Sequence, residues 1–490
     1  MRIVIILTGG RSGSDLLQSL FDGHEEISQF PGILHFTDNF IKTLNSIQEQ
    51  YDNYKIPTFI IGGWHDLFKN APLSIYSGLK SDVPKKLLMG PWMHIAPADA
   101  FPGPRIDHEY ECLRWWDYWL KGINTGIMEE PPITIFVRKY NEPKSKRKIE
   151  NGYWKTFTEL PKNTIQEDHY YLNSDFSLNK KSNEENIGIN YKYKPSVGLN
   201  SLGTLTALGH NIGLPLDQKE DEAYSLSFTS NKLEKDLNVF GFPKVSLAIS
   251  STAEVSSFIV RLCDVAPDNT VSLVSRGSLN ATRRESKSKP TPLEKNKQYT
   301  ITFDLNAIAY VFEKNHNIRV DISSSDFPEL WPTPESAINT IYSGNLNSKL
   351  ILPIFKGDFS ESITHFKTPP EKNEEPSSVK KWNLIKDIIN NKTGFEFEYG
   401  DSIEIEKNSY FSYSGCMSGY VNEDDPSDVS MESTYKAIFE VNFSTVESES
   451  KTKVTSDSNA YHFYTSLNVI QNGKPYYNKT WLKTFPRVLT

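Results

Sequence analysis

The sequence predicts an α/β unit of parallel strands near the start of the chain, followed by β-structure over most of the remainder. Two short apolar runs, residues 57–63 and 86–90, each end in glycine, as buried parallel strands do before a tight turn. From about residue 133 to 354, and again after 382, short segments alternate apolar and polar residues, the pattern of antiparallel sheets. The 490 residues include 9 Trp, 24 Tyr and 27 Phe, enough apolar volume for several folded domains.

The α/β unit is expected to begin with a strand at residues 2–7. The turn at 8–14 then precedes a predicted helix, and a second helix is expected at about 40–51. The pattern is again helical after each of the two glycine-ended strands. It is clearest in the long segment 107–121, which Gly122 ends.

The β-structure up to about residue 356 is expected to form a sandwich or barrel, because its segments are short and have a period of two. Residues 357–381 are rich in Lys, Glu, Pro and Ser and predict a linker, after which strand patterning returns. The clearest predicted strands are 244–250, 257–263, 317–323, 437–443 and 460–465.

The net charge of −8 disfavours nucleic acid or an anionic membrane surface as a partner. The apolar run at the amino terminus is shorter than the roughly 7–15 residues of a secretory signal, and no run approaches the roughly 20 residues of a membrane span. We therefore expect a cytoplasmic protein. Cys112, Cys263 and Cys416 are far apart, with no metal-binding spacing, and are expected to be buried free thiols.

Asp66 and His94 each follow one of the two glycine-ended strands. Ligands of open α/β sheets bind at the carboxyl ends of the strands, so these two residues are expected to lie close together. An acid followed by a histidine is the order of the last two members of a Ser-Asp-His triad in α/β-hydrolases. No Gly-x-Ser-x-Gly sequence precedes Asp66, so the nucleophile of such a triad is expected to be missing from this chain.

Two other residues compete for roles in this triad. His65 is beside Asp66 and is expected to line a pocket or lie at the surface, since neighbours on a turn point in different directions. Ser12 lies between a predicted strand and a predicted helix, as a nucleophile does, but it stands only 54 positions before Asp66. It is kept as a candidate nucleophile beside a purely structural strand-turn-helix interpretation.

Two further patterns have a structural and a functional interpretation. Trp115, Trp116 and Trp119 have helical spacing, which favours packing against the β domain over a ligand site. The acidic stretch 422–428 has no EF-hand pattern, so a solvated loop is favoured over a calcium site. No metal ion and no cofactor are expected.

From about residue 51 to the end, the order and spacing of several short strings resemble those of one enzyme family. The strings are Ile61-Gly-Gly-Trp-His-Asp-Leu-Phe68, Gly90-Pro-Trp-Met-His94, Arg114-Trp-Trp-Asp-Tyr-Trp-Leu-Lys-Gly122, Asp264-Val-Ala-Pro-Asp268, Ser275-Arg-Gly-Ser-Leu-Asn280, Asn317-Ile-Arg-Val320 and Phe485-Pro-Arg-Val-Leu489. The family is the CocE/NonD serine hydrolases, relatives of X-prolyl dipeptidyl aminopeptidases and of cocaine-esterase-type enzymes.

This resemblance implies a truncated α/β-hydrolase domain followed by a jelly-roll, galactose-binding-like β-sandwich and a further β-rich region. It assigns the acid role to Asp66 and the base role to His94. The family's nucleophile sits earlier, in a Gly-x-Ser-Tyr-x-Gly-type elbow, with a helical cap before the acid, and this chain has neither. The family's Asp-rich string is also altered here, at residues 250–258.

Residues 1–45 resemble the opening of a sulfotransferase, through the strings at 7–17 and 24–27. The resemblance implies that this loop holds a 5′-phosphate on backbone N–H groups at a helix N-terminus. The residues concerned are Gly10, Arg11, Ser12, Gly13 and Ser14. The remainder of a sulfotransferase is not found, so the chain looks like a junction of two gene fragments at about residue 45–50.

These observations predict five units: a sulfotransferase-like fragment, the C-terminal part of an α/β-hydrolase domain, a jelly-roll sandwich, a linker and a β-rich region. Their expected bounds are 1–45, 46–140, 141–356, 357–381 and 382–490. The function that the resemblance implies is hydrolysis of a small ester or peptide by a Ser-Asp-His mechanism. The alternatives are a non-catalytic remnant whose β-sandwich is an interaction or assembly module, and a sulfotransferase-like nucleotide binder.

The shortened parallel sheet has a consequence for assembly. Residues 3–7 are available to pair with 58–61, but most of a hydrolase sheet would still be missing, and an unpaired apolar edge promotes association. We therefore expect a homo-oligomer or a separate chain that carries the missing hydrolase half.

Overall fold

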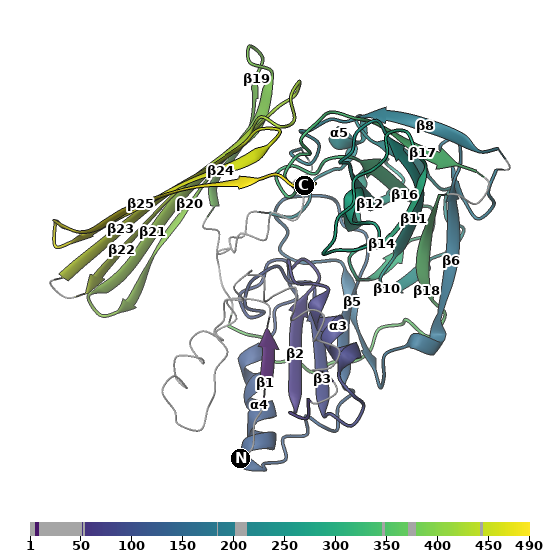
Figure 1. Ribbon diagram of the computed structural model, residues 1–490. Helices are drawn as coiled ribbons and strands as arrows, with labels where there is room; N and C mark the ends of the chain where they lie inside the picture. Colours follow the sequence, from purple (N-terminus) through teal and green to yellow (C-terminus); the bar gives the residue numbers. More distant parts are fainter. Residues whose placement is uncertain are drawn as a thin grey trace.

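The computed structural model describes residues 5–8, 51, 54–183, 185–200, 213–344, 348–370, 379–441 and 444–490. Figure 1 shows three parts: an α/β part at the bottom, a β-sandwich at the upper right, and a long single-layer sheet that extends to the upper left. We call this last sheet the arm.

The α/β part is built on parallel strands in the order β1-β2-β3-β4. Their bounds are β1 (Ile5–Thr8), β2 (Thr58–Gly63), β3 (Lys85–Gly90) and β4 (Ile133–Arg138), and β5 (Gly152–Phe157) pairs antiparallel with β4. Every residue of β2 is buried, as in a sheet covered on both faces. Ile5 pairs with Thr58 and Thr8 with Ile61, which confirms the predicted pairing of the first strand.

Two helices cover opposite faces of this sheet. In α3 (Ala71–Gly78), Pro72 lies over Gly62 so closely that a Cβ on that glycine would be 2.4 Å from the proline ring. In α4 (His108–Lys121), Trp115 packs on Phe59, with ring centroids 5.6 Å apart. Because Phe59 and Gly62 differ by an odd number of positions on one strand, they face opposite sides.

The bounds of α4 agree with the prediction from the sequence. The Asp107 side chain accepts a hydrogen bond from the Tyr110 amide at 3.0 Å, and Gly122 ends the helix at φ 73°, a left-handed conformation that glycine adopts without strain. Trp115 is fully buried, so the predicted packing role is confirmed. Its partner Phe59 belongs to the parallel sheet rather than to the β domain expected from the sequence.

The parallel sheet continues into the sandwich, because β4 also pairs with β15. The continuous path is β1-β2-β3-β4-β15-β10-β18-β11-β17-β8 in the described part of the chain, and a second sheet has the order β13-β12-β16-β9. One apolar core lies between the two sheets and contains, among others, Phe228, Leu247, Phe258 and Val320. The predicted β-sandwich is therefore confirmed, while its jelly-roll connectivity stays a prediction.

The predicted strands at 244–250, 257–263 and 317–323 correspond to β11 (Lys244–Ser251), β12 (Ser257–Val265) and β16 (Asn317–Ser323). The remaining elements of this part are η1 (Lys162–Thr164), β6 (Ile165–Leu172), β7 (Leu178–Asn179), β8 (Ile187–Lys192), α5 (Lys219–Glu222), β9 (Leu226–Thr229), β10 (Leu237–Gly241), β13 (Val271–Asn280), η3 (Ala281–Arg283), β14 (Tyr299–Asp304), β15 (Ile308–Phe312), β17 (Ile338–Ser343) and β18 (Lys349–Phe355).

The arm is an antiparallel meander in which each strand pairs with the next. Its strands are β19 (Val379–Asp387), β20 (Lys392–Glu406), β21 (Ser409–Asn422), β22 (Val429–Val441), β23 (Ser444–Ser456), β24 (Ala460–Gln471) and β25 (Lys474–Pro486). Residues 423–428 of the acidic stretch 422–428 connect β21 to β22, and there Asp425 accepts a hydrogen bond from the Ser427 amide at 3.0 Å. Its position between two hairpin strands agrees with the predicted loop.

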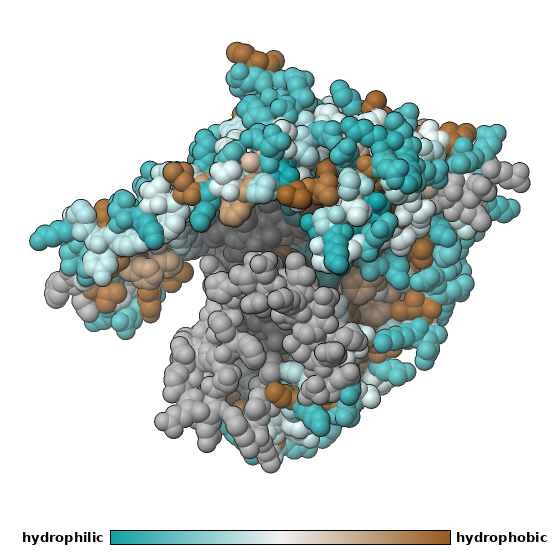
Figure 2. Space-filling view, viewed as in Figure 1, coloured by the Kyte–Doolittle hydropathy of each residue, from teal (hydrophilic) through white to brown (hydrophobic). Residues whose placement is uncertain are grey.

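The arm has one apolar and one polar face. Phe397 pairs with Met417, and both side chains lie on the apolar face, whereas Glu398 pairs with Cys416 on the polar face. Near the body this apolar face is covered by Phe327 and Trp331 of the sandwich. Figure 2 shows apolar side chains on the lower side of the arm at its free end, where Ile403, Phe439 and Tyr477 are exposed.

The three cysteines are free, as expected. Cys112 and Cys263 are buried, which confirms the prediction for these two thiols. The prediction was wrong for Cys416, which is exposed because it lies on the polar face of a single-layer sheet.

Candidate active site

The site begins where β2 and β3 end side by side. Gly63 pairs with Gly90 at the carboxyl ends of the two strands. Beyond them, the Trp64 amide donates to the Gly90 carbonyl at 2.9 Å and the His65 amide donates to the Trp92 carbonyl at 3.0 Å. The two loops therefore run together as they leave the sheet, as expected for neighbouring parallel strands.

Glycine is required at this point for steric reasons. A Cβ on Gly63 would lie 2.1 Å from the carbonyl oxygen of Trp92, a distance that no packed structure accommodates. The glycine that predicted the end of the strand thus allows the two loops to approach each other. Trp64 and Trp92 fix the loops further, since their indole N–H groups donate to the carbonyls of Phe136 and Pro104 at 2.7 and 2.8 Å.

The structure brings Asp66 and His94 together. His94 Nδ1 lies 3.0 Å from Asp66 Oδ2, and the Phe68 amide donates to Asp66 Oδ1 at 2.7 Å, so each carboxylate oxygen has a partner. Asp66 is buried, and the His94 side chain is 14% exposed. The Phe68 ring lies 5.7 Å from the imidazole, centroid to centroid.

This geometry fixes the orientation of the imidazole. A carboxylate that accepts from Nδ1 selects the tautomer protonated at Nδ1, which leaves Nε2 as a proton acceptor. Among the residues that the structure describes, none makes a hydrogen bond to His94 Nε2. The pair can therefore act as an oriented base toward a group placed beyond Nε2.

His65 has a different environment from His94. It is buried, lines a cavity, and has Nε2 3.2 Å from Glu150 Oε1. Burial lowers the pKa of His65 to about 4, so the ring is neutral near pH 7. The prediction that His65 lines a pocket is confirmed.

Glu150 is the centre of a buried ion cluster that sequence reasoning missed. Arg138 Nε lies 3.1 Å from Glu150 Oε1, and Arg147 Nη2 lies 3.0 Å from Oε2. Burial by itself would raise the pKa of Glu150, but His65, Arg147 and Arg138 hold it below its usual range. No sequence motif points to this cluster, because its members come from separate loops and strands.

The other predicted site residues lie outside the described part of the chain. They are Gly10, Arg11, Ser12, Gly13 and Ser14, for which both the nucleophile and the phosphate-binding interpretation stay predictions. Within the described residues there is no group of three or more His, Cys, Asp or Glu side chains arranged to hold a metal ion. No helix in that part of the chain is long and apolar enough to cross a membrane.

Comparison with known families finds matches for the α/β part and for the β-sandwich. Residues 125–369, half of the chain, match the X-Pro dipeptidyl-peptidase C-terminal non-catalytic domain. Residues 34–96, which include Asp66 and His94, match the X-Pro dipeptidyl-peptidase S15 family.

Individual relatives give the same result. A putative serine esterase of Mycobacterium bovis is 28% identical over 298 residues, covering 55% of this chain and 45% of that protein. The cocaine esterase of a Rhodococcus species is 24% identical over 350 residues, covering 64% of this chain and 58% of that protein. The chain thus spans about half the length of the curated relatives that it matches.

A solved structure shares the fold. The aminopeptidase of a marine-sediment Thaumarchaeota archaeon superposes with a TM-score of 0.53 at 17% identity, covering 65% of this chain and 60% of that one. The α/β part joined to a β-sandwich is therefore an arrangement that this chain has in common with a known protein. The chain belongs to the CocE/NonD-type serine hydrolase family.

Proposed function

We propose that this chain supplies the acid and the base of a serine hydrolase that cleaves a small ester or amide. The observation that carries the proposal is the 3.0 Å contact between Asp66 and His94 Nδ1 at the carboxyl ends of neighbouring parallel strands. Family membership supports it, since both residues lie in the segment that matches the S15 family. The proposal covers both an ester and an X-Pro peptide as the substrate.

The proposed mechanism is acyl transfer to water. A serine hydroxyl attacks the carbonyl carbon while His94 Nε2 takes its proton, and Asp66 stabilises the imidazolium that forms. His94 then gives the proton to the leaving alcohol or amine, and the acyl-enzyme remains. Water, activated by the same nitrogen, releases the acid and restores the serine.

The serine of this mechanism is proposed to come from outside the described residues. A separate chain or a further segment of a longer protein would carry the elbow serine, in agreement with relatives about twice as long as the matched region. Ser12 is the candidate within this sequence. The proposal also keeps the expectation of a cytoplasmic protein that needs no cofactor.

Labelling with a fluorophosphonate, which reacts with activated serines, tests the proposal. The purified chain should show little labelling and little hydrolysis of 4-nitrophenyl acetate, because loss of a triad nucleophile removes most of the rate. The chain co-purified with a partner that carries the serine should be labelled, and peptide mapping then identifies that serine. Modification of Ser12, abolished in Ser12→Ala, would instead make Ser12 the nucleophile.

Matched variants make this test specific. Asp66→Asn and His94→Gln should abolish any labelling, whereas His365→Gln, at an exposed histidine before the arm, should leave it unchanged. Labelling that persists in His94→Gln would contradict the assigned base. A lack of labelling in every preparation would favour the interaction-module alternative.

A further inference from the structure

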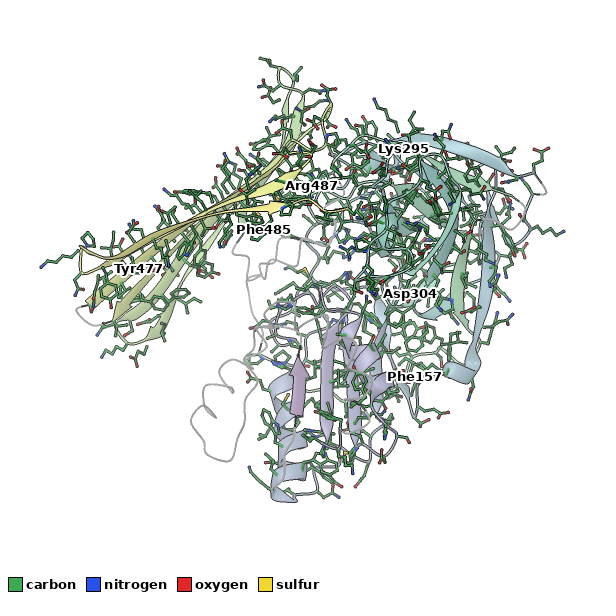
Figure 3. All side chains as sticks on the ribbon, viewed as in Figure 1. Phe157, Lys295, Asp304, Tyr477, Phe485 and Arg487 are labelled. Carbon is green, nitrogen blue, oxygen red and sulfur yellow. The ribbon has the colours of Figure 1, made fainter. Side chains whose placement is uncertain are left out.

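A small cavity lies at the junction between the α/β part and the sandwich. Its volume is about 30 Å³, and the polar side chains that line it include Lys69, Arg138, Ser275, Arg276 and Asn306. Figure 3 marks the junction with Asp304 at the end of β14, two residues before Asn306. The cavity walls therefore come from segments more than 200 positions apart in the sequence.

Hydrogen bonds across the junction hold the walls together. Asn70 donates from Nδ2 to Asn306 Oδ1 at 2.9 Å, and its Oδ1 accepts from the Ala307 amide at 2.9 Å. Ser275 Oγ donates to the Asn306 carbonyl at 2.6 Å. Lys69 immediately precedes Asn70, so these bonds fix the lysine on the wall that faces the sandwich.

Lys69 differs from the other cations of this cavity. Arg138 is paired with Glu150, and Arg276 lies 2.7 Å from Glu329 and also contacts Asp326. Lys69 is only 9% exposed, yet its side chain makes no hydrogen bond and no ion pair with any residue that the structure describes. Its side chain is thus a largely buried cation without a counter-ion of its own.

The charges around Lys69 favour a guest of negative charge. Burial and the neighbouring Arg276 and Arg138 lower the pKa of Lys69 to about 8. The carboxylates that attract the Lys69 charge, those of Glu329 and Asp66, are already engaged with Arg276 and His94. A buried cation in such surroundings is unfavourable unless an anion offsets it.

The size of the cavity limits the class of anion. A cavity of about 30 Å³ holds only a small polar guest, and a carboxylate is among the smallest anionic groups of organic molecules. Two oxygens are what a carboxylate presents, whereas sulfate and phosphate present four. We propose that the cavity binds the carboxylate group of a small monovalent acid, paired with Lys69 in the positive field of Arg276 and Arg138.

The carboxylate could belong to a free acid or to an ester that carries one. Both sources present the same carboxylate group. The first test therefore measures the thermal unfolding midpoint of the full chain at increasing concentrations of sodium formate. Wild type should show a saturable rise of a few degrees that Lys69→Met does not show. Lys69→Arg, which keeps the charge, and Lys289→Met, at an exposed lysine that is not among the residues lining the cavity, should both retain this rise.

Further ligands distinguish a free acid from an ester that carries a carboxylate, and a carboxylate from neutral compounds and sulfate. Formamide and dimethyl succinate, which are neutral, should have no saturable effect, and sodium sulfate should act equally on wild type and Lys69→Met. If monomethyl succinate raises the thermal midpoint and formate does not, the site is assigned to an ester that carries a carboxylate. Equal responses of wild type and Lys69→Met to every carboxylate would overturn the proposal.

A second measurement covers the case in which Lys69→Met does not fold. In saturation-transfer NMR, magnetisation should pass from the wild-type protein to the proton of bound formate. Acetate should displace formate and remove this signal, whereas acetamide should not. A lack of transfer would overturn the proposal. Neither test requires a serine nucleophile, so failure here is independent of the roles proposed for Asp66 and His94.

Discussion

Asn70 and Asn306 join two parts of the molecule. The side-chain amide of Asn70 donates to Oδ1 of Asn306 at 2.9 Å, and the Asn70 oxygen accepts from the next amide, that of Ala307, at the same distance. Asn70 lies directly before α3 of the α/β part, and Asn306 lies between β14 and β15 of the sandwich. One side chain therefore links the loop after Asp66 to the β domain.

Removing this link should weaken the junction. Asn70→Ala deletes two hydrogen bonds and leaves the Ala307 amide without its acceptor, which should lower the free energy of unfolding by about 1–3 kcal/mol. Denaturant unfolding followed by tryptophan fluorescence measures the change. Asn478→Ala, at an exposed position in β25, is the control and should change it by less than about 0.5 kcal/mol. Equal effects of the two variants would contradict the importance of the link.

Asp66 should determine which nitrogen of His94 carries the proton. In wild type the ¹⁵N resonances of the neutral imidazole should show Nδ1 protonated, because Nδ1 lies 3.0 Å from the carboxylate. Asp66→Asn should remove this preference, since the amide can also donate. Histidine NMR on the folded chain measures the tautomer without any need for activity, and His365 provides an internal reference. An unchanged His94 tautomer in Asp66→Asn would show that another group orients the ring.

Burial of His65 should make the stability of the chain depend on pH. The folded protein holds His65 neutral to about pH 4, whereas the unfolded chain titrates near pH 6.5. The unfolded state therefore binds more protons between these values. The contribution of neutral His65 to the free energy of unfolding is complete above pH 6.5. As the pH falls toward 4, up to about 3 kcal/mol of it is lost.

The comparison of wild type with His65→Gln isolates this contribution. Burial of Asp321, whose pKa is raised to about 6, acts in the opposite direction, since its stabilisation is lost as the pH rises through the same range. Both proteins contain Asp321, so the difference between their unfolding free energies cancels its effect. That difference should shrink as the pH falls from 6.5 to 4. A difference that is constant with pH would rule out a buried neutral His65.

Gly63 should not tolerate a side chain. A Cβ there would lie 2.1 Å from the backbone oxygen of Trp92, so Gly63→Ala must displace the loop that carries His94. Gly473→Ala is the matched control, because Gly473 has a positive φ but nothing within 4 Å of the added carbon. We expect about 1–2 kcal/mol of destabilisation for Gly473→Ala from backbone strain, and more for Gly63→Ala. Thermal unfolding of the two variants checks the order.

Hydrogen exchange should vary along the length of the arm. Phe395 and Phe397 of β20 are buried beneath the sandwich, whereas Ile403 and Ile405 of the same strand are 49% and 59% exposed. Backbone amides near the body should therefore exchange more slowly than those near the free end. Figure 3 places Tyr477 at that free end and Arg487 where the arm meets the body. Uniform protection along β20 would indicate that the outer half is also covered in solution.

Much of the fold could be predicted because local chemistry determines it. Buried parallel strands need continuous apolar runs, and glycine is needed where the two loops that follow them approach each other. These two patterns predicted β2 and β3, with Asp66 after the first strand and His94 after the second. The helical pattern from residue 107 and the glycine at position 122 predicted the bounds of α4. Period-two patterning predicted the strands of the sandwich and the arm, since a sheet with one covered face requires it.

Only the tertiary structure decided what lies around these elements. The position of Lys69 beside Arg276 in one cavity, the Glu150 ion cluster beside His65, and the exposure of Cys416 on a single-layer sheet all depend on segments far apart in sequence. Propensity and patterning act over a few residues and determine which face of an element is apolar. They do not determine which other element covers that face, because this depends on the packing of the whole chain.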